Sequence, residues 1–235
     1  MTSLSKNARI AGLLYLVCVI TGPFVLLYVP GKLFVSGDAT ATANNILTHE
    51  SLFQAYIVVG LISEIAFIAT VLALYRLLKD VNRELATLMV IVILIDAPLA
   101  FLSIMNQIAT LAFVQGADFL AVFDKPQRDA LATLLINIDK KGIPVDELFW
   151  GLWLLPLGVL VYRSNFLPRF LGVWLFINGV AYVILSFTGL LLPQHLEMVN
   201  KISYPALFGE VALMLWLVVK GAEPRARGET VSAVG

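Results

Sequence analysis

Apolar residues fall into six long runs along the chain, and short polar or charged segments separate them. A helix rises about 1.5 Å per residue, so about 20 apolar residues cross the roughly 30 Å hydrocarbon core of a bilayer. The runs therefore predict an all-α fold, a polytopic membrane protein built as a bundle of six transmembrane helices. The predicted spans are 10–29, 52–75, 85–114, 148–162, 170–192 and 203–219. Gly22-Pro23 lies within the first span, and we expect a tolerated kink there.

Composition supports the membrane assignment and excludes several other classes. Of the 235 residues, 60% are hydrophobic and 14% are charged, against about 45–50% and about 25% in soluble domains. The formal net charge is zero, so the chain lacks the basic footprint of a nucleic-acid-binding protein. The single cysteine, Cys18, lies in the first run and excludes an intrachain disulfide.

The distribution of Lys and Arg predicts the orientation in the membrane. Ten of the 16 fall on the side that holds both termini, and four of the other six lie in one long loop. Because basic residues favour the cytoplasmic side, we expect both termini in the cytoplasm of a bacterial inner membrane. We expect residues 1–221 to form the transmembrane domain and residues 222–235 to be a disordered cytoplasmic tail.

Two short helices are predicted in the outer loops. Asp38 is placed to cap a helix over 39–47, and Asp124, with Pro126 in the first turn, to cap a second one. In the second helix, apolar side chains recur at i, i+3, i+4 and i+7: Leu131, Leu134, Leu135 and Ile138. This pattern predicts an amphipathic helix on the outer surface of the bundle or in the membrane interface. The fourth span is short, which would place Glu147 at or just inside the outer edge of the bilayer.

Three charged residues lie inside the apolar runs, and all three are acidic: Glu64, Asp96 and Glu210. Counted along the helix from the nearest charged boundary, each lies about 15–18 Å deep. Asn178, in the fifth run, lies at about 14 Å by the same count. Polar groups from four spans are therefore expected in one layer near the bilayer midplane.

The third span carries its polar residues on one side. Asp96, Ser103, Gln107 and Thr110 fall within about 60° of arc on a helix, so this stripe should face protein or water. A charged carboxylate at the centre of a span costs about 2.5–3.5 kcal/mol. We therefore expect at least one of the three acids to be uncharged at pH 7. We also expect the three carboxyl groups to converge in the narrow interior, next to one another or to Asn178.

Two further patterns bear on packing. Gly151 and Gly158, and likewise Gly172, Gly179 and Ser186, recur every seven residues, which favours close contact between helices. We expect most of the four tryptophans to be interfacial or lipid-facing anchors: Trp150, Trp153, Trp174 and Trp216.

Motifs for known chemistry are sparse. The chain has no glycine-rich phosphate loop, no H-E-x-x-H and no Ser/His/Asp arrangement. Its two histidines, His49 and His195, lie on separate predicted loops, so we expect neither a metal site nor a cofactor. Catalytic residues cannot be named from the sequence.

Three functional hypotheses remain open. The first is binding or transport of a small lipophilic or cationic ligand. Its candidate residues form the polar layer: Glu64, Asp96, Glu210, Asn178, Ser103 and Gln107. The second is an intramembrane enzyme that uses a protonated Glu or Asp as general acid on an apolar, isoprenoid-like substrate. The third is a structural or regulatory partner that binds no ligand. A water-connected cavity would favour the first, a closed apolar pocket the second and no cavity the third.

Several strings resemble those of one bacterial family of multi-pass membrane proteins. They are 9–16 (RIAGLLYL), 37–47 (GDATATANNIL), 81–83 (VNR), 162–172 (YRSNFLPRFLG) and 209–212 (GEVA). The family is catalogued as domain of unknown function 4386, and the resemblance covers nearly the whole chain. It implies a six-helix bacterial membrane protein. It brings no known activity and no site residues.

Overall fold

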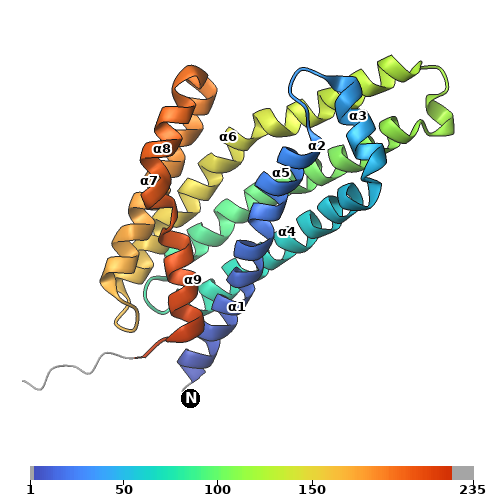
Figure 1. Cartoon of the computed structure of the whole chain (residues 1–235). Helices are drawn as coiled ribbons and strands as arrows, with labels where there is room; N and C mark the ends of the chain where they lie inside the picture. Colours follow the sequence, from blue (N-terminus) through green and yellow to red (C-terminus); the bar gives the residue numbers. More distant parts are fainter. Residues whose placement is uncertain (1–2, 224–235) are drawn as a thin grey trace, which may run out of the picture.

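Helices make up nearly all of residues 3–223, which are the residues that the computed structural model describes (Figure 1). The elements are α1 (Ser3–Pro23), the π-helical turn η1 (Phe24–Tyr28), α2 (Val29–Leu33), α3 (Ala39–Thr48), α4 (Glu50–Leu78), α5 (Arg83–Gln115), η2 (Asp118–Leu120), α6 (Lys125–Arg163), α7 (Arg169–Leu191), η3 (Pro193–His195), α8 (Leu196–Leu207) and α9 (Gly209–Val219).

Six helical segments are long and apolar enough to cross a membrane. They are Leu4–Leu33, Glu50–Leu78, Arg83–Gln115, Lys125–Arg163, Arg169–Leu191 and Pro193–Val219. The predicted fold class is thereby confirmed. The predicted disordered tail falls almost entirely on residues 224–235, which lie outside the described residues.

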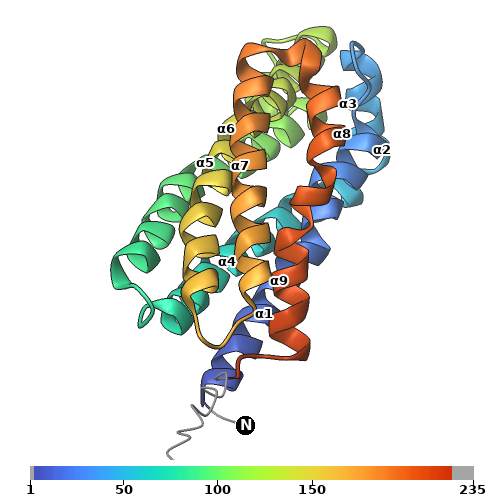
Figure 2. The same ribbon diagram turned by 90° about the vertical axis from the view of Figure 1, so that its left-hand side faces the viewer.

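The six segments form a closed ring in which neighbours along the chain pack side by side. α4 packs against α5, α5 against α6 and α6 against α7, and the ring closes where α9 lies between α7 and α1 (Figures 1 and 2). α1 also packs against α4. One end of the ring holds the N-terminus and the end of α9, and we call it the terminal end. The opposite end holds α3, and we call it the α3 end.

A seam of small residues brings α6 and α7 into backbone contact, as the sevenfold spacing predicts. A Cβ atom built on Gly151 would lie 2.7 Å from the carbonyl oxygen of Gly179. One built on Gly158 would lie 2.8 Å from the carbonyl oxygen of Gly172. Ser186 continues the seam and is fully buried. The two helices can approach this closely only because these positions carry minimal side chains.

The helix type of the first span changes at Gly22-Pro23, where the sequence predicts a kink. Pro23 ends α1, and the five-residue π-helical turn η1 carries the chain into α2. Pro23 lacks an N–H, and a local π-helical turn lets the remaining backbone groups find partners inside the membrane. The span therefore continues as helix to Leu33.

Both predicted caps are present, but the second predicted helix is not a separate element. Asp38 accepts a hydrogen bond from the N–H of Ala41, and Asp124 forms a capping box with Gln127. The helix that begins after Asp124 runs on through Pro144 to the end of the fourth span. Glu147 lies within this 39-residue helix, and its place at or just inside the outer edge of the bilayer stays a prediction.

The prediction placed this helix on the outer surface of the bundle or in the membrane interface, and the surroundings of its two faces correct that placement. The apolar stripe points outward, with Leu134 and Ile138 about half exposed. The opposite stripe faces the inside of the bundle and includes Thr133 and Lys140. In a bilayer, apolar side chains face lipid and polar ones face the protein interior. The expected amphipathic helix is thus the first half of a bundle helix.

The last span is broken in its middle. α8 ends at Leu207 and α9 begins at Gly209. Side chains of α7 donate to carbonyl groups near the break: Trp174 Nε1 to Pro205 at 3.1 Å and Asn178 Nδ2 to Leu207 at 3.5 Å. Interrupted backbone is tolerated at membrane depth where neighbouring helices supply such partners.

Candidate functional site

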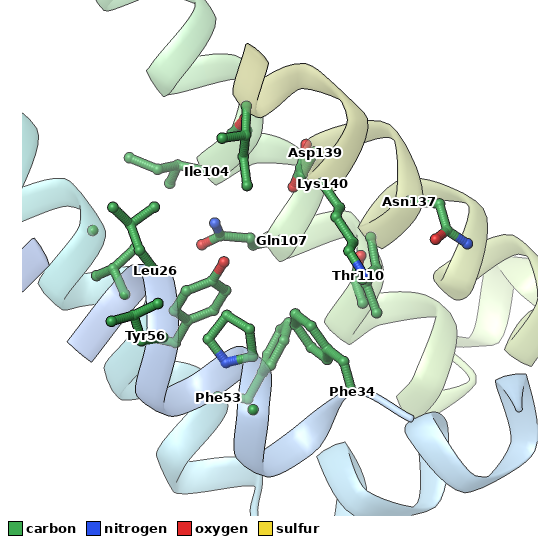
Figure 3. A pocket seen from close by; sticks show the side chains of 18 of the residues that line it. Leu26, Phe34, Phe53, Tyr56, Ile104, Gln107, Thr110, Asn137, Asp139 and Lys140 are labelled. Carbon is green, nitrogen blue, oxygen red and sulfur yellow. The ribbon is translucent and has the colours of Figure 1, made fainter. Parts of the chain in front are cut away.

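A cavity of about 580 Å³ lies between the first span, α4, α5 and α6, in the half of the ring nearer the α3 end (Figure 3). Much of its wall is aromatic or aliphatic, and Phe34, Phe53, Tyr56, Ile104 and Trp150 are among the lining residues. Pockets of about 300–1,000 Å³ are the size that small ligands occupy. The cavity is therefore large enough for a small organic molecule.

Carboxyl groups outnumber amino groups in this cavity. Glu64 from α4 and Asp139 and Asp146 from α6 line it together with one basic residue, Lys140. Asp139 accepts a hydrogen bond from Asn106 Nδ2 at 2.7 Å, which fixes the register of α6 against α5.

Asp96 lies next to this group although it does not line the cavity. It is 3% exposed and is within electrostatic range of Glu64 and Asp146. One acidic side chain from each of three helices, Glu64, Asp96 and Asp146, therefore lies toward the deep end of the cavity. This arrangement favours a positively charged occupant.

Several buried polar atoms around the cavity have no hydrogen-bond partner among residues 3–223. Gln107 is 7% exposed and lines the cavity, and its Oε1 atom is unpartnered. Glu64 Oε1 and Asp96 Oδ1 are also buried and have no hydrogen-bond partner. Leaving a buried acceptor unpaired costs about 1–3 kcal/mol. These atoms therefore need a donor that the described residues do not provide.

The predicted polar stripe of the third span does face inward. Asp96, Gln107 and Thr110 are buried, and Ser103 lines the cavity. Residues on the other side of α5 are exposed, as Met105 is at 65%. The periodicity argument for this helix is confirmed.

The other two predicted site residues have different partners. Glu210 accepts a hydrogen bond from the Tyr15 hydroxyl at 2.5 Å and one from the Tyr182 hydroxyl at 3.5 Å. Glu210 and Asn178 are not among the residues that line the cavity. Asn178 instead lies fully buried beside the break in the last span.

Aromatic side chains join the Glu210 group to the cavity. The ring of Tyr182 packs edge-on against Trp150, with centroids 5.8 Å apart, and Trp150 lines the cavity. Cys18 lies within electrostatic range of both Glu64 and Glu210. The predicted site residues thus divide into a cavity group, with Glu64, and an adjoining group in which tyrosines bind Glu210, so the structure does not bring all three carboxyl groups into the one expected site.

The cavity extends from the interior of the membrane toward the α3 end. Glu64 lies 12 residues before Arg76, or about 18 Å from the basic boundary at the terminal end. Lys140 lies 23 residues before Arg163, or about 35 Å from the same boundary. Since the hydrocarbon core is about 30 Å thick, Lys140 falls near the far interface. Lys140 and Asn137 are exposed, so the cavity reaches the molecular surface there.

Sequence reasoning missed the contribution of α6 to the cavity. Three pairs of lining residues recur at sevenfold spacing on this helix: 133 and 140, 136 and 143, and 139 and 146. The spacing is visible in the sequence. It was overlooked because charged residues near Pro144 suggested a loop rather than an uninterrupted helix.

One tryptophan does not behave as an anchor. Trp153 is fully buried and packs against Tyr15 and Phe67, with ring centroids 6.1 and 5.2 Å apart. Both histidines are exposed, and the part of the chain that the structure describes holds no group of three or more metal-ligating side chains.

Six apolar spans, four of which enclose a partly acidic cavity, define the class, a multi-pass membrane protein. The chain matches the family described as domain of unknown function (DUF4386) over residues 10–221, and it belongs to that family. It is also similar to an uncharacterized protein from the archaeon Archaeoglobus fulgidus, with 29% identity over 170 residues, 71% of this chain and 84% of the relative. No solved structure matches the chain.

Proposed function

We propose that this protein binds a small organic cation with an apolar body in the cavity and carries it between the membrane interior and the α3 side. The aromatic wall offers a surface for the apolar body, and cations bind favourably over aromatic faces. The acidic groups at the deep end offer a place for the charge. Binding or transport accounts for both kinds of lining.

One observation carries this proposal. Gln107 and Glu64 present buried, unpartnered oxygen atoms at a cavity large enough for a small molecule. An interior built only for packing would not leave a space of this size beside unpaired acceptors. A bound ammonium group or its hydration water would satisfy them.

The dry pocket of an intramembrane general acid has less support. Proton donation to an apolar substrate requires a site shielded from water. This cavity reaches the exposed residues Asn137 and Lys140. A connection to the surface is what a binding or transport site needs.

We further propose that both termini lie in the cytoplasm, so that the cavity opens outward. Basic residues lie in or directly beside the short turns at the terminal end, Lys79 and Arg83 at the turn 79–82 and Arg163 and Arg169 on either side of 164–168, as the positive-inside rule requires. The cavity would then take its ligand from the outer side of the membrane.

Hexyltrimethylammonium is a suitable probe, because its charge is permanent and its chain is too short to form micelles readily. The protein in nanodiscs of a zwitterionic phospholipid is titrated with the probe by calorimetry. We expect saturable binding by the parent and at least about tenfold weaker binding by Glu64→Gln, since a charge-assisted contact is lost.

Glu84→Gln is the matched control, because it makes the same chemical change at an exposed position outside the cavity. It should leave the affinity unchanged. Thermal unfolding shows whether each variant is folded. Absence of saturable binding to the parent, or equal affinity of Glu64→Gln and the parent, would refute the proposal.

A further inference from the structure

Charges are unevenly placed along the cavity. Asp146 lies 17 residues before Arg163, about 26 Å from the terminal-end boundary, and it is within electrostatic range of Glu64. Lys140 is six residues nearer the α3 end, or about 9 Å along α6. Glu64 and Asp146 therefore lie toward the deep end, while Asp139 and Lys140, the one basic side chain among the described lining residues, lie toward the mouth.

Lys140 forms no ion pair with the acidic side chains of the described residues. Within residues 3–223 the ion pairs are Lys125 with Asp129 and Lys201 with Glu197, and Lys140 takes part in neither. Its neighbour Asp139 is engaged by Asn106. Figure 3 shows the Lys140 side chain extending from α6 along the cavity, with its ammonium end directed away from Asp139.

A ligand whose cationic head reaches the deep acids lays the rest of its length toward the mouth. For a head bound at Asp146, the deep acid nearest the mouth, a second positive charge about 9 Å along the cavity would come to the depth of Lys140. Like charges at close range repel one another, and the repulsion is stronger near a protein surface of low dielectric than in bulk water.

We infer that Lys140 is a specificity-determining residue, which restricts the site to ligands that carry one positive charge at one end. The inference rests on the proposed function, since it requires a cation in the cavity. It names the substrate class more narrowly: monocationic amphiphiles that enter head first, with dications of similar length rejected.

Two probes that differ only in their second charge test this inference. Hexyltrimethylammonium has one quaternary ammonium group, and hexamethylene-bis(trimethylammonium) has one at each end of the same chain. Both affinities are measured by calorimetry on the full chain in nanodiscs. We expect the parent to prefer the monocation by at least about tenfold.

Substitutions at Lys140 should reduce the preference for the monocation, and a negative side chain should reduce it more than a neutral one. Lys140→Gln should bring the two affinities within about threefold, and Lys140→Glu should favour the dication. Lys141→Gln is the matched control, because Lys141 is the neighbouring exposed lysine and does not line the cavity. It should keep the ratio of the parent. A lysine that acts only as an interfacial anchor would alter stability without altering the ratio.

The outcomes separate the two proposals. If the parent binds neither probe, the proposed function fails, and this inference fails with it. If the parent binds both probes equally, or if Lys140→Gln keeps the ratio of the parent, the cavity is a cation site and the role of Lys140 is refuted. The ratio of the two probe affinities is measured on the unmodified protein, so the test stands even if Lys140→Glu does not fold.

Discussion

Replacing Gly151 by Ala tests whether the backbone contact between α6 and α7 stabilises the ring. The added Cβ atom would lie 2.7 Å from the carbonyl oxygen of Gly179 and 2.8 Å from Cγ2 of Val183. Ordinary contact begins at about 3.4 Å, so the helices must separate locally by about 0.7 Å. Overpacking of this kind costs about 1–3 kcal/mol. Neighbouring contacts of the seam would loosen as well, because α6 and α7 are rigid helices.

Gly142→Ala is the matched control on the same helix, because a Cβ atom there meets nothing within 4 Å. Alanine is favoured over glycine in a helix by about 1 kcal/mol, and both variants receive this gain. The difference between them therefore isolates the packing cost. In thermal unfolding of the detergent-solubilised protein, Gly151→Ala should unfold several degrees below Gly142→Ala. Equal midpoints would show that the seam is not a close contact in solution.

Two further predictions concern topology and the Glu210 group. In a chain with Cys18 replaced by alanine, a single cysteine at the exposed Phe119 should react with a membrane-impermeant maleimide in intact cells, and one at Asn165 should not; the reverse labelling would overturn the orientation. Tyr15→Phe should lower the free energy of unfolding by about 1–3 kcal/mol, because Glu210 loses a buried donor. Tyr162→Phe, at an exposed hydroxyl, should not, and equal losses would contradict this role.

The spans and caps followed from the sequence because their causes are local. Hydropathy reports whether a segment faces lipid, and a capping carboxylate acts within three residues of its own position, as Asp38 and Asp124 do. The inward stripe of α5 followed for a similar reason. Side chains such as Asp96 and Gln107 share a face through helical geometry alone.

Features that depend on partners distant in sequence could not be predicted in this way. Tyr15 and Glu210 are 195 residues apart, and nothing local to either predicts their hydrogen bond. The length of α6 was misjudged for a different reason. Hydropathy treats every polar residue as a departure from the membrane, whereas Asp139 and Asp146 are polar because they line a cavity inside it.

The closure of the ring by α1 and α9 determines when this protein can finish folding. α1 is synthesised first and α9 last. At about 5–20 residues per second, Tyr15 waits roughly 10–40 s for Glu210 to be translated. The hairpins from α4 to α7 can pair as they emerge, because their partners are adjacent in the chain. Ring closure is thus a late step of biogenesis, and a chain truncated before the last span would leave the Tyr15 side of α1 unpaired in the bilayer.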